Sequence, residues 1–289
     1  MVEKYIEEVC RSLGNLNQAC LKEHRKKYPA GCLGEGESFR NLRLGRSESV
    51  SRVFEVELSK ALTKINEDLY FFIDHPVSLY DKNDCYMGKV YYPDIMVVKG
   101  LNLDELENYC DNKCLNKKTL RKKPKEFNSA FQTKGELVAF LELKIDLGYV
   151  DIKKGNKQNG KLFQGNFVKK MTQREEDWSN ADHVKCNYIV NPADSLERKL
   201  NTQVGKIEVH NNKTAKRFAF VSSRMNHGER VQPFLDFMET INYQTCFLLE
   251  RHHPNSGLIS QDEIKQDIYA NNKDKNSALI ELLKVLTMQ

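Results

Sequence analysis

Two carboxylates and a lysine stand at the ends of apolar segments, where charged side chains are costly. Asp94 follows Pro93 directly before the run IMVV, and Glu142 and Lys144 follow the run LVAFL. Carboxylate oxygens are ligands that Mg²⁺ prefers, with water and phosphate oxygens completing its coordination shell. If the two carboxylates meet, they could hold Mg²⁺, which lowers the pKa of a bound water and polarises a phosphoryl group.

The lysine would solve a charge problem that the two carboxylates create. Side chains alternate along a strand, so Glu142 and Lys144 should share a face with Val138 and Phe140, about 7 Å apart along the strand. Two carboxylates side by side repel each other, and a divalent cation with an ammonium group allows both to ionise. Lys144 could then orient the attacking water or offset charge that develops on the phosphate.

A third carboxylate stands on the apolar face of a predicted helix. Residues 47–66 place apolar side chains at helical spacing, and Glu57 lies among them, whereas Glu55 falls on the polar side. A charged and unpaired carboxylate on such a face costs several kcal/mol, so Glu57 needs a partner. A share in the metal site, directly or through water, would supply one.

In the order helix Glu, strand Asp and strand Glu-x-Lys, these residues resemble the three motifs of a known superfamily. The segments SRVFEVELSKAL, YYPDIMVV and AFLELKID resemble the motifs of the PD-(D/E)xK, or restriction-endonuclease-like, nucleases. The resemblance covers roughly residues 48–190. The interval between the second and third motifs is longer than usual in the family, and an insertion over residues 100–135 accounts for it.

The resemblance implies a role for each matching residue. Asp94 and Glu142 would bind magnesium, and the backbone carbonyl of Leu143 would be a further ligand. Lys144 would assist the attacking water, and Glu57 would support the metal site. These four side chains form the expected catalytic set.

The resemblance implies a magnesium-dependent endonuclease that hydrolyses DNA phosphodiester bonds, a metal-dependent deoxyribonuclease with Mn²⁺ as a substitute metal. A type II restriction or other defence nuclease would be its setting, and double-stranded DNA its partner. Two alternatives stay open. One is a non-catalytic nucleic-acid-binding or assembly protein that retains the nuclease fold. The other is an RNA-directed nuclease, because the metal site alone cannot sense a 2′-hydroxyl.

Short segments rich in aromatic and β-branched residues should position these groups. They predict strands at residues 69–73, 89–99, 136–145, 184–190 and 217–221. Pro93 removes a ladder donor and is tolerated at a strand start, edge or bulge. Together with the helices, these strands predict an α/β fold with a restriction-endonuclease-like mixed β-sheet core flanked by helices.

Helical periodicity predicts additions at both ends of that core. An apolar stripe from Val2 to Cys20 favours a helix that docks on the core, with homodimerisation as the alternative. Residues 1–46 would form this arm and a loop, residues 47–225 the nuclease core, and residues 226–289 a C-terminal helical extension. A capping-box pattern from Ser260 to Glu263, an apolar helix at 278–286, and Phe163, Phe167 and Met171 spaced four apart mark further helices.

Basic residues cluster near the predicted site. They could contact phosphates, each contact adding to a salt-sensitive affinity, although most lysine-rich loops are merely solvated. The candidates in the insertion and after the Glu142 strand are Lys117, Lys118, Arg121, Lys122, Lys123, Lys153 and Lys154.

Composition sets the outer limits. The 289 residues are 40% hydrophobic, which suffices for one globular domain with additions, and the net charge of +5 is compatible with a polyanionic partner without requiring one. We find no run of about 18 apolar residues and no basic-then-apolar start, so a cytoplasmic protein without a membrane partner is expected. The eight cysteines read as reduced thiols; Cys110 and Cys114 lack a second pair that would complete a zinc site.

Overall fold

A computed structural model of the chain shows two compact units. The sheet unit comprises Asn66–Glu142 and Lys170–Arg217, and the terminal unit comprises Met1–Ile65, Leu143–Lys169 and Phe218–Gln289. The predicted boundaries at residues 47 and 226 stay predictions. The structure describes residues 7–12, 14–15, 55, 57–59, 61–62, 66, 68–73, 77–101, 114–116, 132–144, 147–148, 150–155, 162–190, 203–211, 213–224, 228–250, 260–272 and 277–287.

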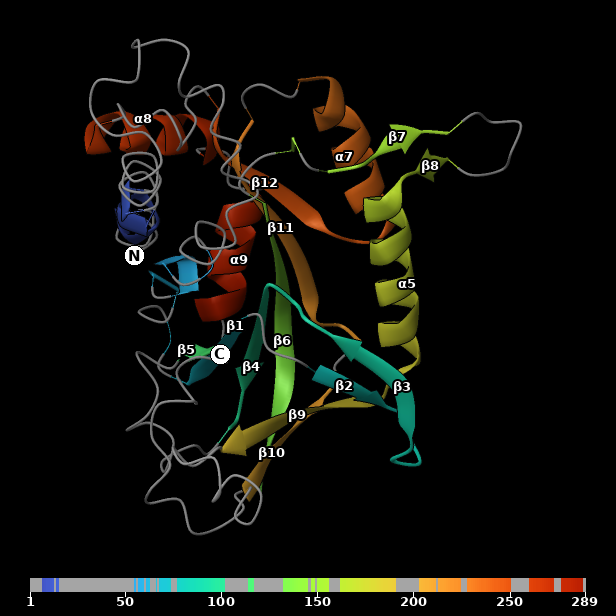
Figure 1. Cartoon of the computed structure of the whole chain (residues 1–289). Coiled ribbons are helices and arrows are strands. Elements are labelled where there is room, and N and C mark those ends of the chain that lie inside the picture. Colours follow the sequence, from blue (N-terminus) through green and yellow to red (C-terminus); the bar gives the residue numbers. More distant parts are fainter. Residues whose placement is uncertain are drawn as a thin grey trace, which may run out of the picture. The chain divides into compact units, whose positions relative to one another are not determined.

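The sheet unit is built on a mixed sheet with the strand order β3-β2-β9-β10-β6-β4-β1-β5 (Figure 1). Along this order, β1 pairs with β5 and β6 pairs with β10 in parallel, and the remaining neighbours in the order are antiparallel. The predicted α/β fold with a mixed β-sheet is therefore confirmed. The strands are β1 (Leu69–Ile73), β2 (Val77–Tyr80), β3 (Tyr86–Tyr91), β4 (Ile95–Lys99), β5 (Cys114–Asn116), β6 (Gln132–Lys144), β9 (His183–Val190) and β10 (Gln203–His210).

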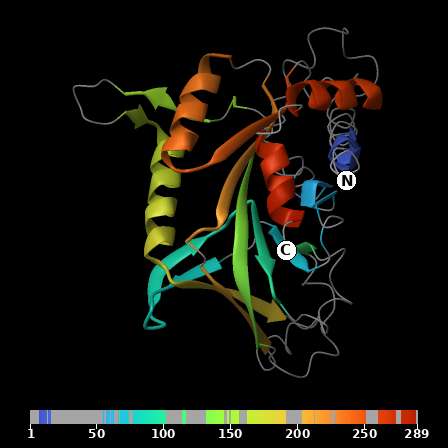
Figure 2. The same ribbon diagram turned by 180° about the vertical axis from the view of Figure 1, so that it is seen from behind.

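Strands β6, β4 and β1 are neighbours in the interior of this sheet, and β4 and β6 lie side by side (Figure 2). Their apolar residues are buried on both faces of the strands, as is typical of strands in the interior of a sheet. One face carries a core cluster that contains Phe72, Met96, Leu137, Phe140 and Trp178. Trp178 meets Phe140 edge-on, with ring centroids 4.5 Å apart.

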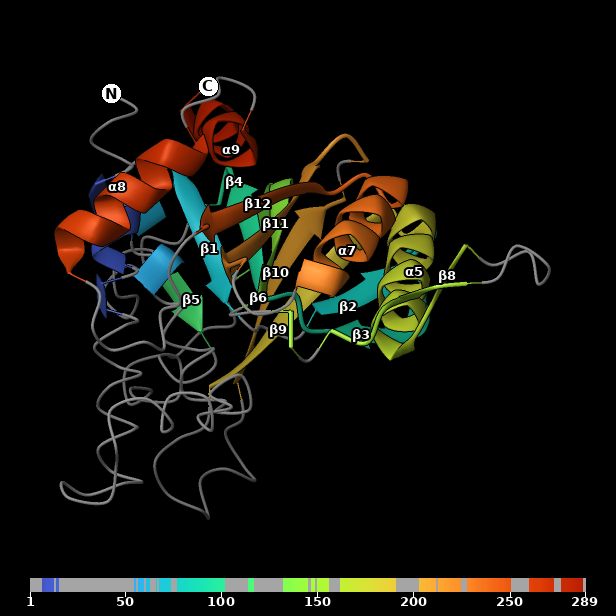
Figure 3. The same cartoon turned by 90° about the horizontal axis from the view of Figure 1, so that it is seen from above.

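Helix α5 (Asn166–Asn180) begins in the terminal unit and continues into the sheet unit, where its Trp178 joins the core cluster. Figure 3 shows this helix beside β2 and β3. Its start is fixed locally, because the Asp151 carboxylate accepts a hydrogen bond from the backbone N–H of Asn166 at 2.9 Å. Gly165 has φ +129, and a Cβ there would lie 2.1 Å from the Asp151 carbonyl oxygen, so only glycine fits.

The terminal unit contains α7 (Gly228–Thr240), α8 (Gln261–Asn272) and α9 (Ala278–Thr287), and all three contact strand β12 (Gln244–Leu249) (Figures 1 and 3). β12 pairs in parallel with β11 (Lys216–Ser223), whose first two residues belong to the sheet unit. A short hairpin pairs β7 (Lys153–Lys154) with β8 (Phe163–Gln164). Within the described ranges, no helix has the length and apolar character needed to cross a membrane.

Several predicted elements are confirmed. The strand at 69–73 and the helix near 278–286 match β1 and α9. Ser260 and Glu263 form the predicted capping box: the backbone N–H of Ser260 donates to the Glu263 carboxylate at 2.8 Å, and the N–H of Glu263 donates to Ser260 Oγ at 3.2 Å. In the part of the first predicted helix that is described, residues 7–12 and 14–15 are helical.

Other predictions need correction. A single strand over 89–99 is wrong: the chain leaves β3 at Tyr91 and enters β4 at Ile95, because Pro93 cannot donate to a ladder. Phe163 lies in β8 rather than on a helix with Phe167 and Met171. The strands β2, β10 and β12, which the sequence did not single out, were missed; they are short or carry several polar residues.

Candidate metal site on the mixed sheet

Asp94 directly precedes β4 and Glu142 lies in β6, and these two strands are adjacent, as predicted, and antiparallel. The register pairs Ile95 with Leu141 and Met96 with Phe140. Asp94 directly precedes Ile95 on one side of this ladder, and Glu142 directly follows Leu141 on the other. Directly opposed residues of such a ladder have Cβ atoms about 5 Å apart, so two carboxylates one step beyond the same pair could reach toward one ion.

A bulge decides which other side chains share that face. The register shifts between Val97 and Val98, so that Val98 pairs with Leu137 and an extra residue of β6 is accommodated at Val138. Leu137 and Phe140 therefore pack in one cluster, whereas strict alternation predicts opposite faces. The prediction that Val138 and Phe140 share a face is thus wrong. Phe140 and Glu142 lie beyond the bulge, where side chains alternate regularly, so these two share a face as predicted.

The carboxylate of Glu142 is buried and lies against a guanidinium. Arg174 on α5 donates from Nη1 to Glu142 Oε2 at 2.8 Å, and the two side chains are 13% and 8% exposed, respectively. A buried carboxylate is costly unless it is paired and hydrogen-bonded. The structure thus places a positive charge where a cation would neutralise Glu142.

Arg174 belongs to a chain of alternating charges. Its Nε lies 3.6 Å from Glu175 Oε1, and Arg217 Nε donates to Glu175 Oε2 at 2.6 Å. Arg217 also donates to the carbonyl of Ala215 at 2.7 Å, and its guanidinium lies 5.5 Å from the ring centroid of Phe140. Glu175 therefore has a second cation beside it.

Sequence reasoning did not single out Arg174, although a signal was there. Phe167, Met171, Arg174 and Trp178 recur at steps of four, three and four along the helix, which puts Arg174 among apolar residues. The same criterion selected Glu57. In both helices, the charged side chain inside the apolar stripe has a side-chain hydrogen-bond partner.

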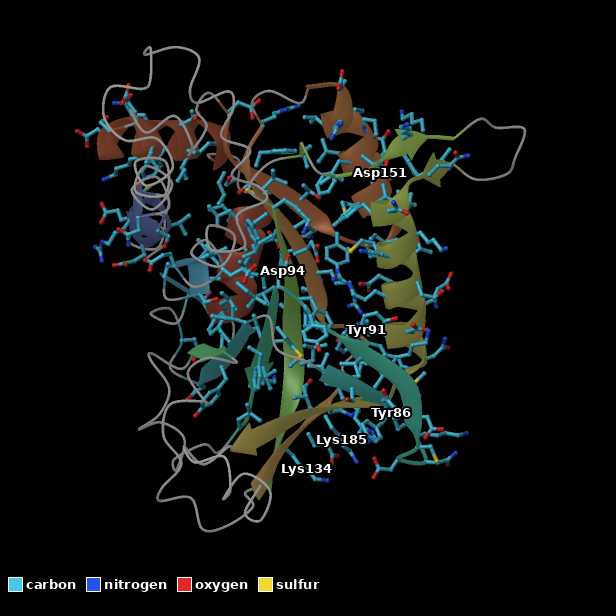
Figure 4. The ribbon with its side chains drawn as sticks, viewed as in Figure 1. Tyr86, Tyr91, Asp94, Lys134, Asp151 and Lys185 are labelled. Carbon is cyan, nitrogen blue, oxygen red and sulfur yellow. The ribbon has the colours of Figure 1, made fainter. Side chains whose placement is uncertain are left out.

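Tyr91 and Asp177 form a second polar contact between β3 and α5. The Tyr91 hydroxyl donates a short hydrogen bond to the carboxylate of Asp177, which also accepts from Gln173 at 3.1 Å and lies 3.5 Å from Lys89 Nζ. Burial, followed by the bond to Asp177, raises the pKa of Tyr91. Figure 4 shows Tyr91 and Asp94 on either side of the break between β3 and β4.

Lys144 and Leu143 continue strand β6 beyond Glu142, in residues that belong to the terminal unit. Lys144 Nζ donates to the carbonyl oxygen of Leu143 at 2.9 Å and lies 5.9 Å from the ring centroid of Phe167. The carbonyl that the resemblance assigns to the metal is thus accessible to a cationic group. The roles of Lys144 and Leu143 stay predictions.

Glu57 also lies in the terminal unit, on a helix whose neighbouring residues Leu58, Ala61 and Leu62 are buried. It is half-buried, and its carboxylate accepts a hydrogen bond from Asn15 Nδ2 at 2.6 Å. Its backbone carbonyl accepts from Ser12 Oγ at 2.8 Å. We expected Glu57 to have a partner because it lies on an apolar face, and Asn15 is one such partner. A role of Glu57 in the metal site stays a prediction.

Two of the basic candidates are described. Lys153 and Lys154 are exposed in the β7–β8 hairpin, and Lys154 Nζ lies 2.9 Å from a carboxylate oxygen of Asp236. Hydrogen bonds from Gln232 and Lys154 lower the pKa of Asp236. The candidates outside the described residues are Lys117, Lys118, Arg121, Lys122 and Lys123.

The donor set fits a hard divalent cation in part. Asp94, directly before β4, and Glu142, in β6, carry oxygens of the kind that Mg²⁺ prefers, and water and phosphate oxygens would complete its coordination shell. In the portions of the chain that the structure describes, no group of three or more His, Cys, Asp or Glu residues is arranged to hold a metal ion. A site at this position would therefore take two protein carboxylates and leave its other positions to water and substrate.

Comparison with known proteins finds no protein family, no curated protein and no solved structure that matches this chain. The functional assignment therefore depends on the residues and their geometry.

Proposed function

We propose that the chain is a magnesium-dependent endonuclease that hydrolyses phosphodiester bonds of double-stranded DNA, on a restriction-endonuclease-like sheet. One observation supports the proposal above the others: the β4–β6 register pairs Ile95 with Leu141, and the acidic residues Asp94 and Glu142 come directly next to this pair, one on each side of the ladder. Asp94 is half-buried and Glu142 is buried, and carboxylates in such surroundings are stabilised by positive charge, which a divalent cation can supply to both at once.

The roles of the residues follow from their chemistry. Asp94 and Glu142 would hold the metal, which supplies an activated water and a polarised phosphoryl group when bound. Pro93 is buried, and its ring restricts the backbone directly before Asp94. The Asp94 side chain is therefore attached to a backbone with little conformational freedom. Lys144 would orient the attacking water by hydrogen bonding, and Glu57 would support the metal ligands through water.

A second candidate function has one observation in its favour. Arg174 already pairs with Glu142 at 2.8 Å, and a guanidinium that permanently replaced the metal would leave a fold without catalysis. The chain would then be a nucleic-acid-binding or assembly protein, with salt-sensitive binding and no metal-dependent cutting.

Incubation of purified protein with plasmid, single-stranded DNA and RNA, in Mg²⁺ or in EDTA, tests the proposal. Wild type should cut plasmid only in Mg²⁺, and Glu142→Ala should lose at least about a thousandfold in rate, as expected when a group that stabilises the transition state is removed. Preferential cutting of RNA would mean that the substrate is RNA rather than DNA, and it would leave the proposed metal site unchanged.

Glu136→Ala is the matched control. Glu136 lies in the same strand, is 40% exposed and forms a surface pair with Lys99 at 3.5 Å. It should retain wild-type cutting. If wild type and both variants fail to cut any substrate yet bind DNA in low salt, the non-catalytic function holds instead.

A further inference from the structure

We propose that Arg174 is a metal-gated phosphate-binding residue: it pairs with Glu142 when no metal is bound, and it turns to a substrate phosphate when the metal takes that carboxylate. This inference depends on the proposed function, because it concerns the same metal site. It assigns to α5 a role in coupling metal binding to DNA binding.

The first support is the position of the guanidinium. Arg174 Nη1 lies 2.8 Å from Glu142 Oε2, and the two side chains are 13% and 8% exposed, respectively. A metal ion bound to Glu142 would carry two positive charges into this space. Because like charges repel strongly where water is scarce, the guanidinium and the metal compete for the carboxylate.

The second support is what happens when Arg174 leaves. Glu175 Oε1 lies 3.6 Å from Arg174 Nε, so a nearby anion can retain one edge of the guanidinium. Glu175 itself remains paired with Arg217 at 2.6 Å. When the metal takes over Glu142, Arg174 can therefore rotate while Glu175 keeps Arg217 as its counter-charge.

The third support is the chemistry of arginine. Its planar guanidinium carries five N–H donors and binds phosphate oxygens through two parallel hydrogen bonds, whereas a metal-bound carboxylate no longer needs it. The phosphate that meets the metal would lie next to the carboxylate that Arg174 has left. Metal and DNA would then each favour the binding of the other, as linkage requires.

Calorimetric titration with Mn²⁺ in the absence of DNA tests the competition. Arg174→Gln should bind Mn²⁺ about tenfold or more tightly than wild type, because the metal no longer displaces a charge-assisted hydrogen bond. Arg217→Gln is the matched control, since Arg217 is also 13% exposed but pairs with Glu175. It should bind Mn²⁺ within about twofold of wild type, as for a change without direct contact.

Binding of a fluorescent DNA duplex, with Ca²⁺ or EDTA, tests the second half. Wild type should gain affinity when Ca²⁺ is added, and Arg174→Gln should lose most of that gain while keeping its affinity in EDTA. Arg174→Lys keeps the charge with a single point of contact and should restore part of the gain. Melting temperatures of all variants show whether each protein is folded before it is compared.

The outcomes separate the two proposals. Wild type that binds no Mn²⁺ overturns the proposed function, and this inference with it. Wild type that binds Mn²⁺, with Arg174→Gln binding it equally or more weakly, overturns the inference alone. Unchanged coupling between Ca²⁺ and DNA in folded Arg174→Gln also overturns it.

Discussion

Two carboxylates of the sheet unit pair with cations in opposite surroundings. Glu142 is 8% exposed and pairs with Arg174 in the interior, whereas Asp84 is 62% exposed and accepts hydrogen bonds from Lys185 and His183 at the β2–β3 turn. Solvent screens the second pair and leaves it worth little. Burial makes the Glu142–Arg174 pair costly to break, because either charge left alone would be buried without a partner. This pair therefore says more about function than the exposed pair at Asp84.

The largest expected effect comes from breaking the buried pair. Arg174→Leu should lower the free energy of unfolding by about 3 kcal/mol, because the Glu142 carboxylate loses its guanidinium in a buried place. Urea denaturation without added metal measures this. The double variant Arg174→Leu/Glu142→Leu should recover much of the loss, since it removes both charges. A loss below about 0.5 kcal/mol, typical of surface changes, would remove the contrast with Asp84.

An intermediate effect should come from Tyr91, which is half-buried and donates to Asp177. Tyr91→Phe should cost about 1 kcal/mol, the net worth of such a hydrogen bond, because Lys89 and Gln173 stay with Asp177.

The contribution of Tyr91 should also depend on pH in a defined direction. Its pKa is raised in the folded state, first by burial and then by Asp177. The stabilisation is therefore complete below the unfolded pKa of about 10 and is lost as the pH rises through the folded value. Denaturation of wild type and Tyr91→Phe at increasing alkaline pH measures it; a difference that grows with pH would contradict the assignment.

The smallest effect should come from Asp84. Hydrogen bonds from Lys185 and then His183 lower its pKa, so its stabilisation is present above the unfolded pKa of about 4 and is lost as the pH falls through the folded value. Asp84→Asn keeps the positive φ of 60 accessible and removes only the charge.

The Asp84→Asn variant should therefore be destabilised less than Tyr91→Phe at neutral pH, with the difference shrinking in high salt. Thermal melts at two salt concentrations test this. A salt-independent loss as large as that of Arg174→Leu would show that exposure does not set the strength of these pairs.

Sequence patterns predicted the local parts of this fold. The spacing of apolar residues and the residue composition were sufficient to predict β1 and α9. The capping box of Ser260 and Glu263 could be predicted because it depends on two residues only three positions apart. The strands next to Asp94 and Glu142, β4 and β6, were predicted only to be adjacent. The register of β4 and β6 shifts at a bulge at Val138, which no local sequence pattern predicted.

The partners of the site were harder to predict. Arg174 meets Glu142 across 32 positions of the chain, and such a contact depends on where α5 crosses the sheet. The strands β2 and β10 were missed because their polar residues weaken the strand signal. Long-range packing decided these features, whereas local propensity decided those that were predicted.

The most direct test of the central claim is to map the metal site without relying on cleavage of DNA. Fe²⁺ bound in place of Mg²⁺, with ascorbate and peroxide, generates radicals that cut the polypeptide next to the metal. We expect cuts near Asp94 and near Glu142 in the same sample, both abolished in Glu142→Ala and both retained in Glu136→Ala. Cuts at only one of these positions, or elsewhere in the chain, would contradict a metal shared by Asp94 and Glu142.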